Sequence, residues 1–444
     1  MGGNLVFNRR RLPGASFRAA ALVCMLAVSA ALPISVAAGS PSNDDFANAR
    51  LIQGNLPFTE TRNTNGASNE TEPESECDNS FDASVWYRIT PTANRVLRAD
   101  TLGSDYNTEI DVFTGSSLAN LNLVDCNDNI DSNNPDLYTS RVAWNGTAGQ
   151  RYYIRVTDAN QDGGGELHLT VRTVKRLSND SFANARRIYS LPFDTNADDT
   201  NATSQALEPR EGLCDVARAT RWYKFTPSRD MVIWANTFVP QDFDTVLAVY
   251  TGNTIGNANQ LVCNDDTWVN SDVIYASGVT FRAHAGVTYH FQVAGYDGES
   301  GSNRKLPFHV QEVTPETNDN FANALAVNDL PYSDNANLRR TTVESGEPDG
   351  DCISAPLYNT AWYEFNPETT AAYEAEISSG ASDTSGIVAV YEVTGSGFGG
   401  LTILDCGSEN SAATFTGNFG TTYMIQVTAD STQTIPAILR VDFD

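Results

Sequence analysis

Two groups of acidic and amide side chains in the middle of the chain have the composition of a cation site. Asp242 and Asp244 precede the apolar run "TVLAVYTG", and Asn264, Asp265 and Asp266 follow the next run, which ends at Cys263. If the two runs form neighbouring strands, both groups lie at one edge of a sandwich. Carboxylate and amide oxygens suit calcium, which takes about six to eight such ligands. The alternative is that these Asn and Asp residues only form turns at strand ends.

Repetition along the chain sets the context of this candidate site. "NDDFANA" at 43–49 returns as "NDSFANA" at 179–185 and "NDNFANA" at 318–324, and each copy is followed by a Trp-Tyr pair. The period of about 138 residues has the size of a whole domain. We therefore predict three domains, over residues 39–174, 175–314 and 315–444, after a leader over residues 1–38.

The three repeats differ in their acidic groups. The first repeat keeps a diluted set, Asp105, Asn107, Asn127 and Asp128. In the third, Ser385 stands where the middle repeat has Asp244, and Gly407-Ser408-Glu409 replaces "NDD". We expect calcium in the middle repeat and none in the third, and the diluted set leaves a site in the first repeat open.

The leader predicts export. Residues 1–38 combine a basic start, an apolar run and a small-residue cleavage pattern at Val36-Ala37-Ala38, without a following stop-transfer sequence. Loss of its four Arg would change the formal net charge from −27 to −31. So acidic a chain is a poor partner for nucleic acid. We predict an exported protein, extracellular, on the cell surface or periplasmic, without membrane insertion; the export route and the oligomeric state stay open.

Six cysteines of the predicted mature chain occur two per repeat. An even, regularly spaced set in an exported chain predicts disulfides, and pairing inside each repeat is the simplest arrangement. Each bridge would close a loop of some 50 residues and contribute roughly 3 to 4 kcal/mol to stability. The predicted pairs are Cys77 with Cys126, Cys214 with Cys263, and Cys352 with Cys406.

The fold predicted for each repeat is an antiparallel, jelly-roll-like β-sandwich. Runs such as "RYYIRVT" at 151–157 and "VIYASGVTF" at 273–281 are rich in β-branched and aromatic residues and are bounded by turn formers. The spacing gives about eight strands per repeat, preceded by one short helix at the "NDxFANA" motif. The chain is therefore expected to be all-β.

The tryptophans divide into core and surface positions. Trp86, Trp222 and Trp362 recur within an apolar strand, and Trp144 aligns with Phe residues, so we expect all four in the core. In the middle repeat, Trp234 aligns with charged residues of the other two, and Trp268 lies in the polar loop after "CNDD". These two form a candidate surface for stacking on a sugar ring or a peptide; the alternative is an incidental or interdomain aromatic.

The ordered set of "NDxFANA", an acidic "EP" segment, "WY", "FDTVLAVYTG", "CNDD" and "AGxxYxxxV" resembles the bacterial pre-peptidase C-terminal (PPC-like) domain, three times over nearly the whole mature chain. The resemblance implies a β-sandwich accessory module of secreted bacterial proteins, with some relatives binding calcium and collagen or polysaccharide. By position, the calcium-associated acids of that family correspond to Asp242, Asp244, Asp265 and Asp266. Departures at Asn107, Asn129 and Ser385 set the outer repeats apart.

No catalytic motif stands out, and we expect no enzyme. The chain has no G-x-S-x-G, no H-E-x-x-H and no phosphate-binding loop. The leading hypothesis is a non-catalytic secreted or surface protein whose calcium-assisted sandwiches bind extracellular glycan or matrix protein. The alternative is a structural spacer without a ligand, and a hydrolase is the weaker third reading.

Overall fold

The computed structural model describes most of the chain after the predicted leader. The described residues are 39–77, 81–130, 138–209, 214, 217–238, 244–269, 272–296, 305–349, 357, 359–379, 386–408, 411–429 and 436–444. The predicted leader, together with Asp242, Cys352, Ser385 and Glu409, lies outside the described residues.

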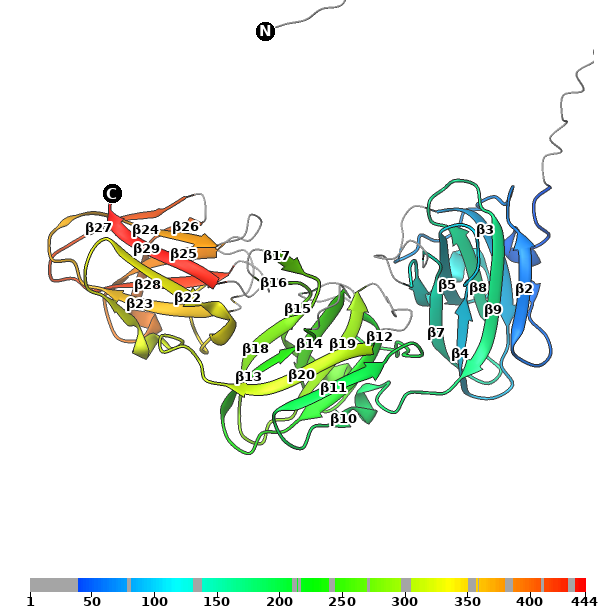
Figure 1. The fold of residues 1–444 in the computed structure, drawn as a ribbon, viewed down its shortest axis with the longest axis horizontal. Coiled ribbons are helices and arrows are strands. Elements are labelled where there is room, and N and C mark those ends of the chain that lie inside the picture. Colours follow the sequence, from blue (N-terminus) through cyan, green and yellow to red (C-terminus); the bar gives the residue numbers. More distant parts are fainter. Residues whose placement is uncertain are drawn as a thin grey trace, which may run out of the picture. The chain divides into compact units, whose positions relative to one another are not determined.

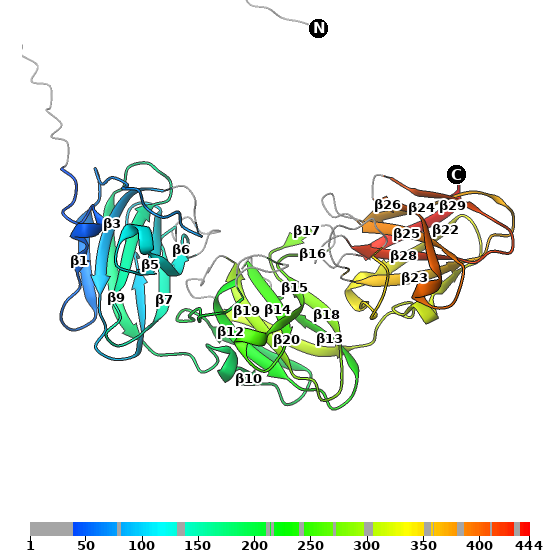
Figure 2. The same ribbon diagram turned by 180° about the vertical axis from the view of Figure 1, so that it is seen from behind.

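The molecule is built from strands, as predicted. Each repeat forms one five-stranded and one four-stranded sheet that pack against each other as a β-sandwich (Figures 1 and 2). The strand order is the same in all three repeats, so the expectation of tandem sandwiches is confirmed. Each repeat has nine such strands where the sequence predicted about eight, because a two- or three-residue strand pairs in parallel with the strand that carries the buried Trp.

The first sandwich is formed by strands β1 to β9. Its larger sheet contains, in spatial order, β1 (Arg50–Leu51), β3 (Asp82–Ile89), β8 (Tyr152–Asp158), β5 (Thr108–Thr114) and β6 (Asn122–Asn127). Its smaller sheet contains β2 (Phe58–Asn63), β9 (Glu166–Val174), β4 (Arg95–Asp100) and β7 (Arg141–Gly146).

The second sandwich repeats this order and adds a two-stranded ribbon. The larger sheet contains β10 (Arg186–Arg187), β12 (Ala217–Phe225), β19 (Tyr289–Tyr296), β14 (Thr245–Thr251) and β15 (Asn259–Asn264). The smaller sheet contains β11 (Phe193–Asp198), β20 (Lys305–Val313), β13 (Met231–Asn236) and β18 (Gly278–Ala283). The ribbon is formed by β16 (Thr267–Val269) and β17 (Asp272–Ile274).

The third sandwich has the same two sheets. The larger contains β21 (Leu325–Val327), β23 (Thr360–Phe365), β28 (Tyr423–Ala429), β25 (Gly386–Val393) and β26 (Leu401–Ser408). The smaller contains β22 (Tyr332–Asn337), β29 (Pro436–Phe443), β24 (Ala371–Ser379) and β27 (Ala413–Gly417).

Short 3₁₀ turns are the helical elements of the described residues. They are η1 (Phe46–Asn48), η2 (Leu118–Asn120), η4 (Phe182–Asn184), η5 (Ile255–Asn257), η6 (Phe321–Asn323), η7 (Leu338–Arg340) and η8 (Phe398–Gly400). The helix predicted at "NDxFANA" is therefore a single three-residue turn, η1, η4 or η6. Its Phe faces a Trp of the neighbouring strand, and the chain then enters a strand directly.

The "NDxFANA" motif fastens the start of each repeat to its buried Trp. Phe46 packs edge-on against Trp86 with ring centroids 5.2 Å apart, and the main chain and side chain of Asn43 bond the main chain of Trp86. The equivalent Phe–Trp pairs lie at 5.1 Å and 5.2 Å in the other repeats. Trp86, Trp144, Trp222 and Trp362 are all fully buried, which confirms the predicted core positions.

Two of the three predicted disulfides lie in the described residues and are formed. Cys77 is bonded to Cys126 and Cys214 to Cys263, with Cα atoms 6.0 and 5.9 Å apart. Each bridge connects the segment before the Trp-bearing strand to the end of an edge strand. The pairing of Cys352 with Cys406 stays a prediction. Among the described residues, no helical segment has the length and apolar character needed to cross a membrane.

Candidate metal centre

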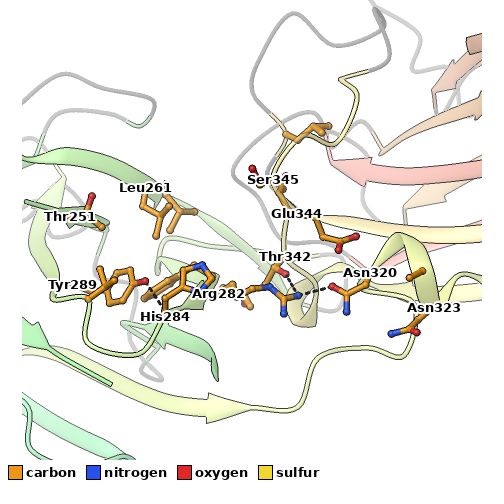
Figure 3. A pocket seen from close by; sticks show the side chains of 17 residues that line it. Thr251, Leu261, Arg282, His284, Tyr289, Asn320, Asn323, Thr342, Glu344 and Ser345 are labelled. Carbon is orange, nitrogen blue, oxygen red and sulfur yellow. Dashed lines mark hydrogen bonds between the residues drawn. The ribbon is translucent and has the colours of Figure 1, made fainter. Parts of the chain in front are cut away.

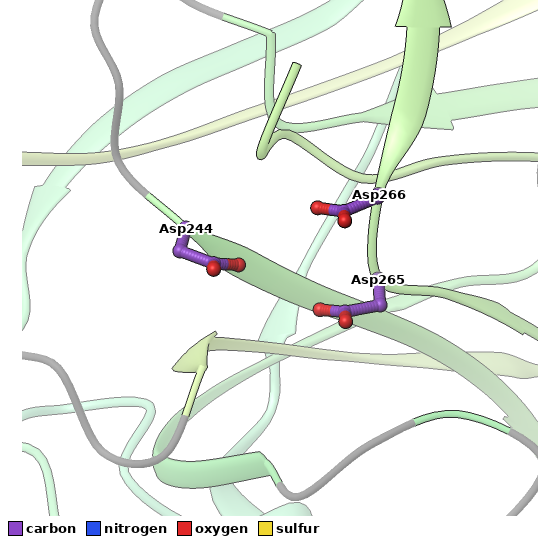
Figure 4. Close-up of side chains that lie close together, drawn as sticks. All are labelled: Asp244, Asp265 and Asp266. Atoms are coloured by element: carbon purple, nitrogen blue, oxygen red, sulfur yellow. The ribbon is translucent and has the colours of Figure 1, made fainter. Parts of the chain in front are cut away.

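Neighbouring strands bring three carboxylates together at one end of the middle sandwich. Asp244 directly precedes β14, and Asp265 and Asp266 directly follow β15. Because β14 and β15 are antiparallel neighbours, with Leu247 opposite Asn264, the start of one meets the end of the other. Carboxylate oxygens of Asp244, Asp265 and Asp266 all lie within 4.8 Å of one another, and each residue is half-buried (Figure 4).

Asn264 holds the turn that presents Asp265 and Asp266. Its Oδ1 accepts hydrogen bonds from the N–H of Gly278 (2.7 Å) and the hydroxyl of Thr267 (2.9 Å), and its Nδ2 donates to the carbonyl of Asp266 (2.7 Å). Both ends of the amide are thus engaged in local bonds. We therefore assign Asn264 to positioning the turn and remove it from the predicted ligand set.

A buried hydroxyl network fixes the start of β14, where Asp244 lies. The hydroxyls of Thr237 and Thr245 are 2.6 Å apart, and the N–H of Ser277 donates to both of them. Sequence reasoning missed this network, although its signal is present: Thr101, Thr108 and Ser140 form the same arrangement in the first sandwich. Repetition of small hydroxyl residues at equivalent positions could have identified it.

The diluted set of the first sandwich is held by separate local bonds. Asp105 accepts the N–H of Glu166 (2.6 Å), Asn107 donates its amide to the side chain of Asn160 (3.2 Å), and Asp128 accepts the side-chain amide of Asn129. Asn160 and Glu166 flank the connection between β8 and β9, whereas Asn129 follows β6. The turn-forming alternative therefore accounts for Asp105, Asn107 and Asp128 in this sandwich.

In the third sandwich, the main chain packs closely at the equivalent turn. Gly407 occupies the position of Asn264, opposite Val388. A Cβ atom at Gly407 would lie 2.5 Å from both the nitrogen of Ala413 and the carbonyl oxygen of Ser411. The main chain therefore fills the space that an Asn side chain occupies in the middle sandwich.

The two candidate stacking tryptophans belong to different elements. Trp234 lies in β13 between the fully buried Ile233 and Ala235, so its half-buried side chain projects from the outer face of the smaller sheet. Its indole contacts Phe238 edge-on, with centroids 5.6 Å apart. Trp268 lies in β16, in the ribbon beside the acidic cluster, and its side chain is outside the described residues.

The acidic "EP" segment supplies a buried carboxylate to each sandwich. Glu72 accepts the indole N–H of Trp86 (3.0 Å), and Glu208 accepts that of Trp222 (2.6 Å). The third equivalent, Glu347, lies beside Trp362; burial raises its pKa to about 7, against the lowering effect of nearby hydrogen bonds. These glutamates are part of the packing around Trp, a role that sequence reasoning did not assign.

A separate cavity of about 910 Å³ is lined by residues of the Gly39–Asp444 unit that include Tyr289, His284 and Glu344 (Figure 3). Arg282 in its wall donates to Asp319 (2.8 Å), Asn320 (2.8 Å) and Thr342 (3.1 Å). Since the charge of Arg282 is already paired with Asp319, we assign the cavity no ligand.

Comparison with known proteins does not identify a family for this chain. No family model matches the chain, and no curated protein matches it. Among solved structures, an uncharacterised protein from Burkholderia cenocepacia matches 57% of this chain and 82% of its own at 10% identity and a TM-score of 0.20. A triple jelly-roll protein of an archaeal virus turret matches 81% of this chain and 83% of its own at 9% identity and a TM-score of 0.15.

Proposed function

We propose that this chain is a non-catalytic exported protein whose middle sandwich binds calcium and which presents a surface for an extracellular glycan or matrix protein. The observation that carries the proposal is the convergence of Asp244, Asp265 and Asp266 within 4.8 Å. Two disulfides support an oxidising, extracytoplasmic environment. The resemblance to PPC-like domains points the same way.

The donor set fits a hard cation of calcium size. Three carboxylates supply charged oxygens, and main-chain carbonyls and water can complete about six to eight ligands. Calcium would also neutralise the mutual repulsion of three clustered negative charges. The neighbouring ribbon β16–β17 begins one residue after Asp266, so an ion here would order the surface that carries Trp268.

Binding of the chain to extracellular polymers tests the proposal. Residues 39–444 are applied to immobilised polysaccharides and matrix proteins, in calcium and in a chelator. Capture that requires calcium and is lost in Asp265→Asn, but not in Asp128→Asn of the first repeat, supports it. If no polymer is captured in either condition while the fold is intact, a structural spacer replaces the proposed binding function.

Trp234 provides a prediction about the contact surface. Trp234→Ala should weaken capture by about tenfold, because stacking of a sugar or peptide on an indole contributes on the order of 1 kcal/mol or more. Glu374 occupies the equivalent position in the third repeat, so Glu374→Ala is the matched control and should leave capture unchanged. Equal capture by both variants and the parent chain would remove Trp234 from the surface.

The spacer alternative is favoured by one observation. The features that recur in all three repeats are packing features, namely the Phe–Trp contact and the buried glutamate, whereas among the described residues the carboxylate cluster occurs in the middle repeat alone. A spacer predicts no ligand and tolerates loss of Trp234. If the chain turned over a substrate and a single acidic substitution abolished that activity, a hydrolase would replace both proposals.

A further inference from the structure

Four adjacent strands of the middle sandwich place a row of polar side chains across one face of the larger sheet. In the register of these strands, Arg187 of β10 is opposite Lys224 of β12, Lys224 is opposite His290 of β19, and His290 is opposite Tyr250 of β14. Residues in register on adjacent strands project from the same face of a sheet. The row therefore gathers two cations and an imidazole.

The row lies on the face away from the sandwich core. Tyr223, Phe225 and Phe291, which alternate with Lys224 and His290 along their strands, belong to the core between the sheets. The outward side chains line a pocket of about 310 Å³. Its wall consists of Arg187, Lys224, Thr226, Asn253, Thr288 and His290.

His290 is the least expected member of this pocket. It is only 5% exposed, its ring stacks on Phe182 with centroids 4.0 Å apart, and its Nδ1 has no hydrogen-bond partner. Burial, followed by the charge of Lys224, lowers the pKa of His290 to about 4, so the ring is neutral at physiological pH. A buried polar atom without a partner costs about 1 to 3 kcal/mol.

The outer repeats show that the row is specific to the middle sandwich. In the first repeat the corresponding residues are Leu51, Arg88, Tyr153 and Phe113. In the third they are Ala326, Glu364, Met424 and Tyr391. The position of His290 is thus filled by large, predominantly apolar side chains elsewhere, and the cations at Arg187 and Lys224 occur together only here.

The cations of this row also differ in their pairing from several buried or partly buried arginines of the chain. Arg155, Arg172 and Arg282 each form an ion pair with an aspartate. Within the described residues, neither Arg187 nor Lys224 has a carboxylate within ion-pair distance, although the formal net charge is −27. Two such cations beside a buried, unpartnered imidazole nitrogen form a local anion-attracting site.

We infer that this pocket binds an oxyanion substituent, carboxylate or sulfate, of an acidic polysaccharide, with Arg187 and Lys224 supplying charge and His290 and the Thr226 and Thr288 hydroxyls supplying hydrogen bonds. That a polysaccharide carries this substituent rests on the glycan binding proposed above.

The pocket and the acidic cluster lie at opposite ends of β14, since Asp244 precedes this strand and Asn253 follows it. Seven strand residues separate them by about 24 Å, so the two sites can be tested independently.

Histidine NMR tests the inference directly. The chain has four histidines, and His168, His284 and His309 serve as internal references for His290. Residues 39–444 are titrated with sodium sulfate, glucuronate and a uronate-containing polysaccharide, at constant ionic strength with chloride, and with glucose as the neutral probe. The His290→Met variant, which carries the third-repeat residue, assigns the His290 signals.

The expected result is a saturable shift of the His290 signals with sulfate, glucuronate and the acidic polysaccharide, and none with glucose. Lys224→Glu, which also introduces the third-repeat residue, should weaken binding at least about tenfold. Lys305→Glu makes the same charge change at an exposed position of β20 and should bind like the parent chain.

Three outcomes would overturn the inference. They are an unchanged His290 spectrum with every anion, equal binding by Lys224→Glu and the parent, and a response to free sulfate without one to the acidic polysaccharide. Capture of neutral glycans without any His290 response would overturn this inference while leaving the proposed glycan binding intact.

Discussion

At the scale of single residues, the sequence identified polar clusters better than it identified the role of each member. Asp244, Asp265 and Asp266 meet as their positions at strand ends predicted. Asn264 belongs to the same motif but is used inside the turn, because an amide that can bond main chain on both sides stabilises a strand end. Adjacent polar residues of one motif thus divide into candidate ligands and a residue that supports the turn, and their spacing in the sequence does not distinguish the two roles.

Glu208 should contribute to stability through the Trp222 indole. Glu208→Ala leaves the buried indole N–H and the Thr220 hydroxyl without their acceptor, and we expect a loss of roughly 1 to 3 kcal/mol in the free energy of unfolding. Denaturant unfolding of residues 39–444 measures it. Glu368→Ala, at an exposed turn, is the control, and equal stability of both variants would contradict the assigned role.

The buried Glu347 predicts a pH dependence of the third sandwich. Its pKa is raised from 4.5 to about 7, mainly by burial, so the folded state holds the proton more tightly than the unfolded chain does. This contribution is fully present below pH 4.5 and is lost as the pH rises through about 7. Stability should therefore fall over this range, by less in Glu347→Gln than in the parent chain. Identical pH profiles from thermal unfolding would contradict the prediction.

At the scale of elements, alternation of apolar residues predicted strands and their buried faces, and these are the confirmed parts of the fold. The run at 273–281 was predicted as one strand, but β17 ends at Ile274 and β18 begins at Gly278. Between them Ser277 turns inward to the hydroxyl network, which a pattern of hydrophobicity does not report. The predicted helix became a 3₁₀ turn because contacts of Phe46 with Trp86 and Tyr153 outweigh local helix signals.

The disulfides predict a measurable element-scale effect. The Cys77–Cys126 bridge spans 49 residues, and its removal in Cys77→Ser/Cys126→Ser should destabilise the first sandwich by roughly 3 to 4 kcal/mol. Chemical denaturation followed through the tryptophans of the first sandwich, Trp86 and Trp144, measures the change. The reduced parent chain is the reference for lost cross-linking, and a double variant as stable as the oxidised parent would refute the contribution.

At the scale of the whole molecule, one fold occurs three times with different surfaces. The Phe–Trp contact that fastens the start of each sandwich is common to all repeats, whereas the carboxylate cluster and the Arg187–Lys224–His290 row belong to the middle one. Comparison of the repeats within a single sequence therefore predicted which positions are core. It could not predict that the turn at Gly407 has no space for a side chain, because this depends on how closely the main chain of Ser411 and Ala413 approaches Gly407.

Calcium titration of residues 39–444 by isothermal calorimetry is the measurement that tests the central claim most directly. The account predicts one calcium ion per chain, with binding abolished in Asp244→Asn and Asp265→Asn and retained in Asp128→Asn, because only the middle sandwich gathers three carboxylates among the described residues. Absence of binding, or binding that survives both substitutions in the middle sandwich, would contradict it.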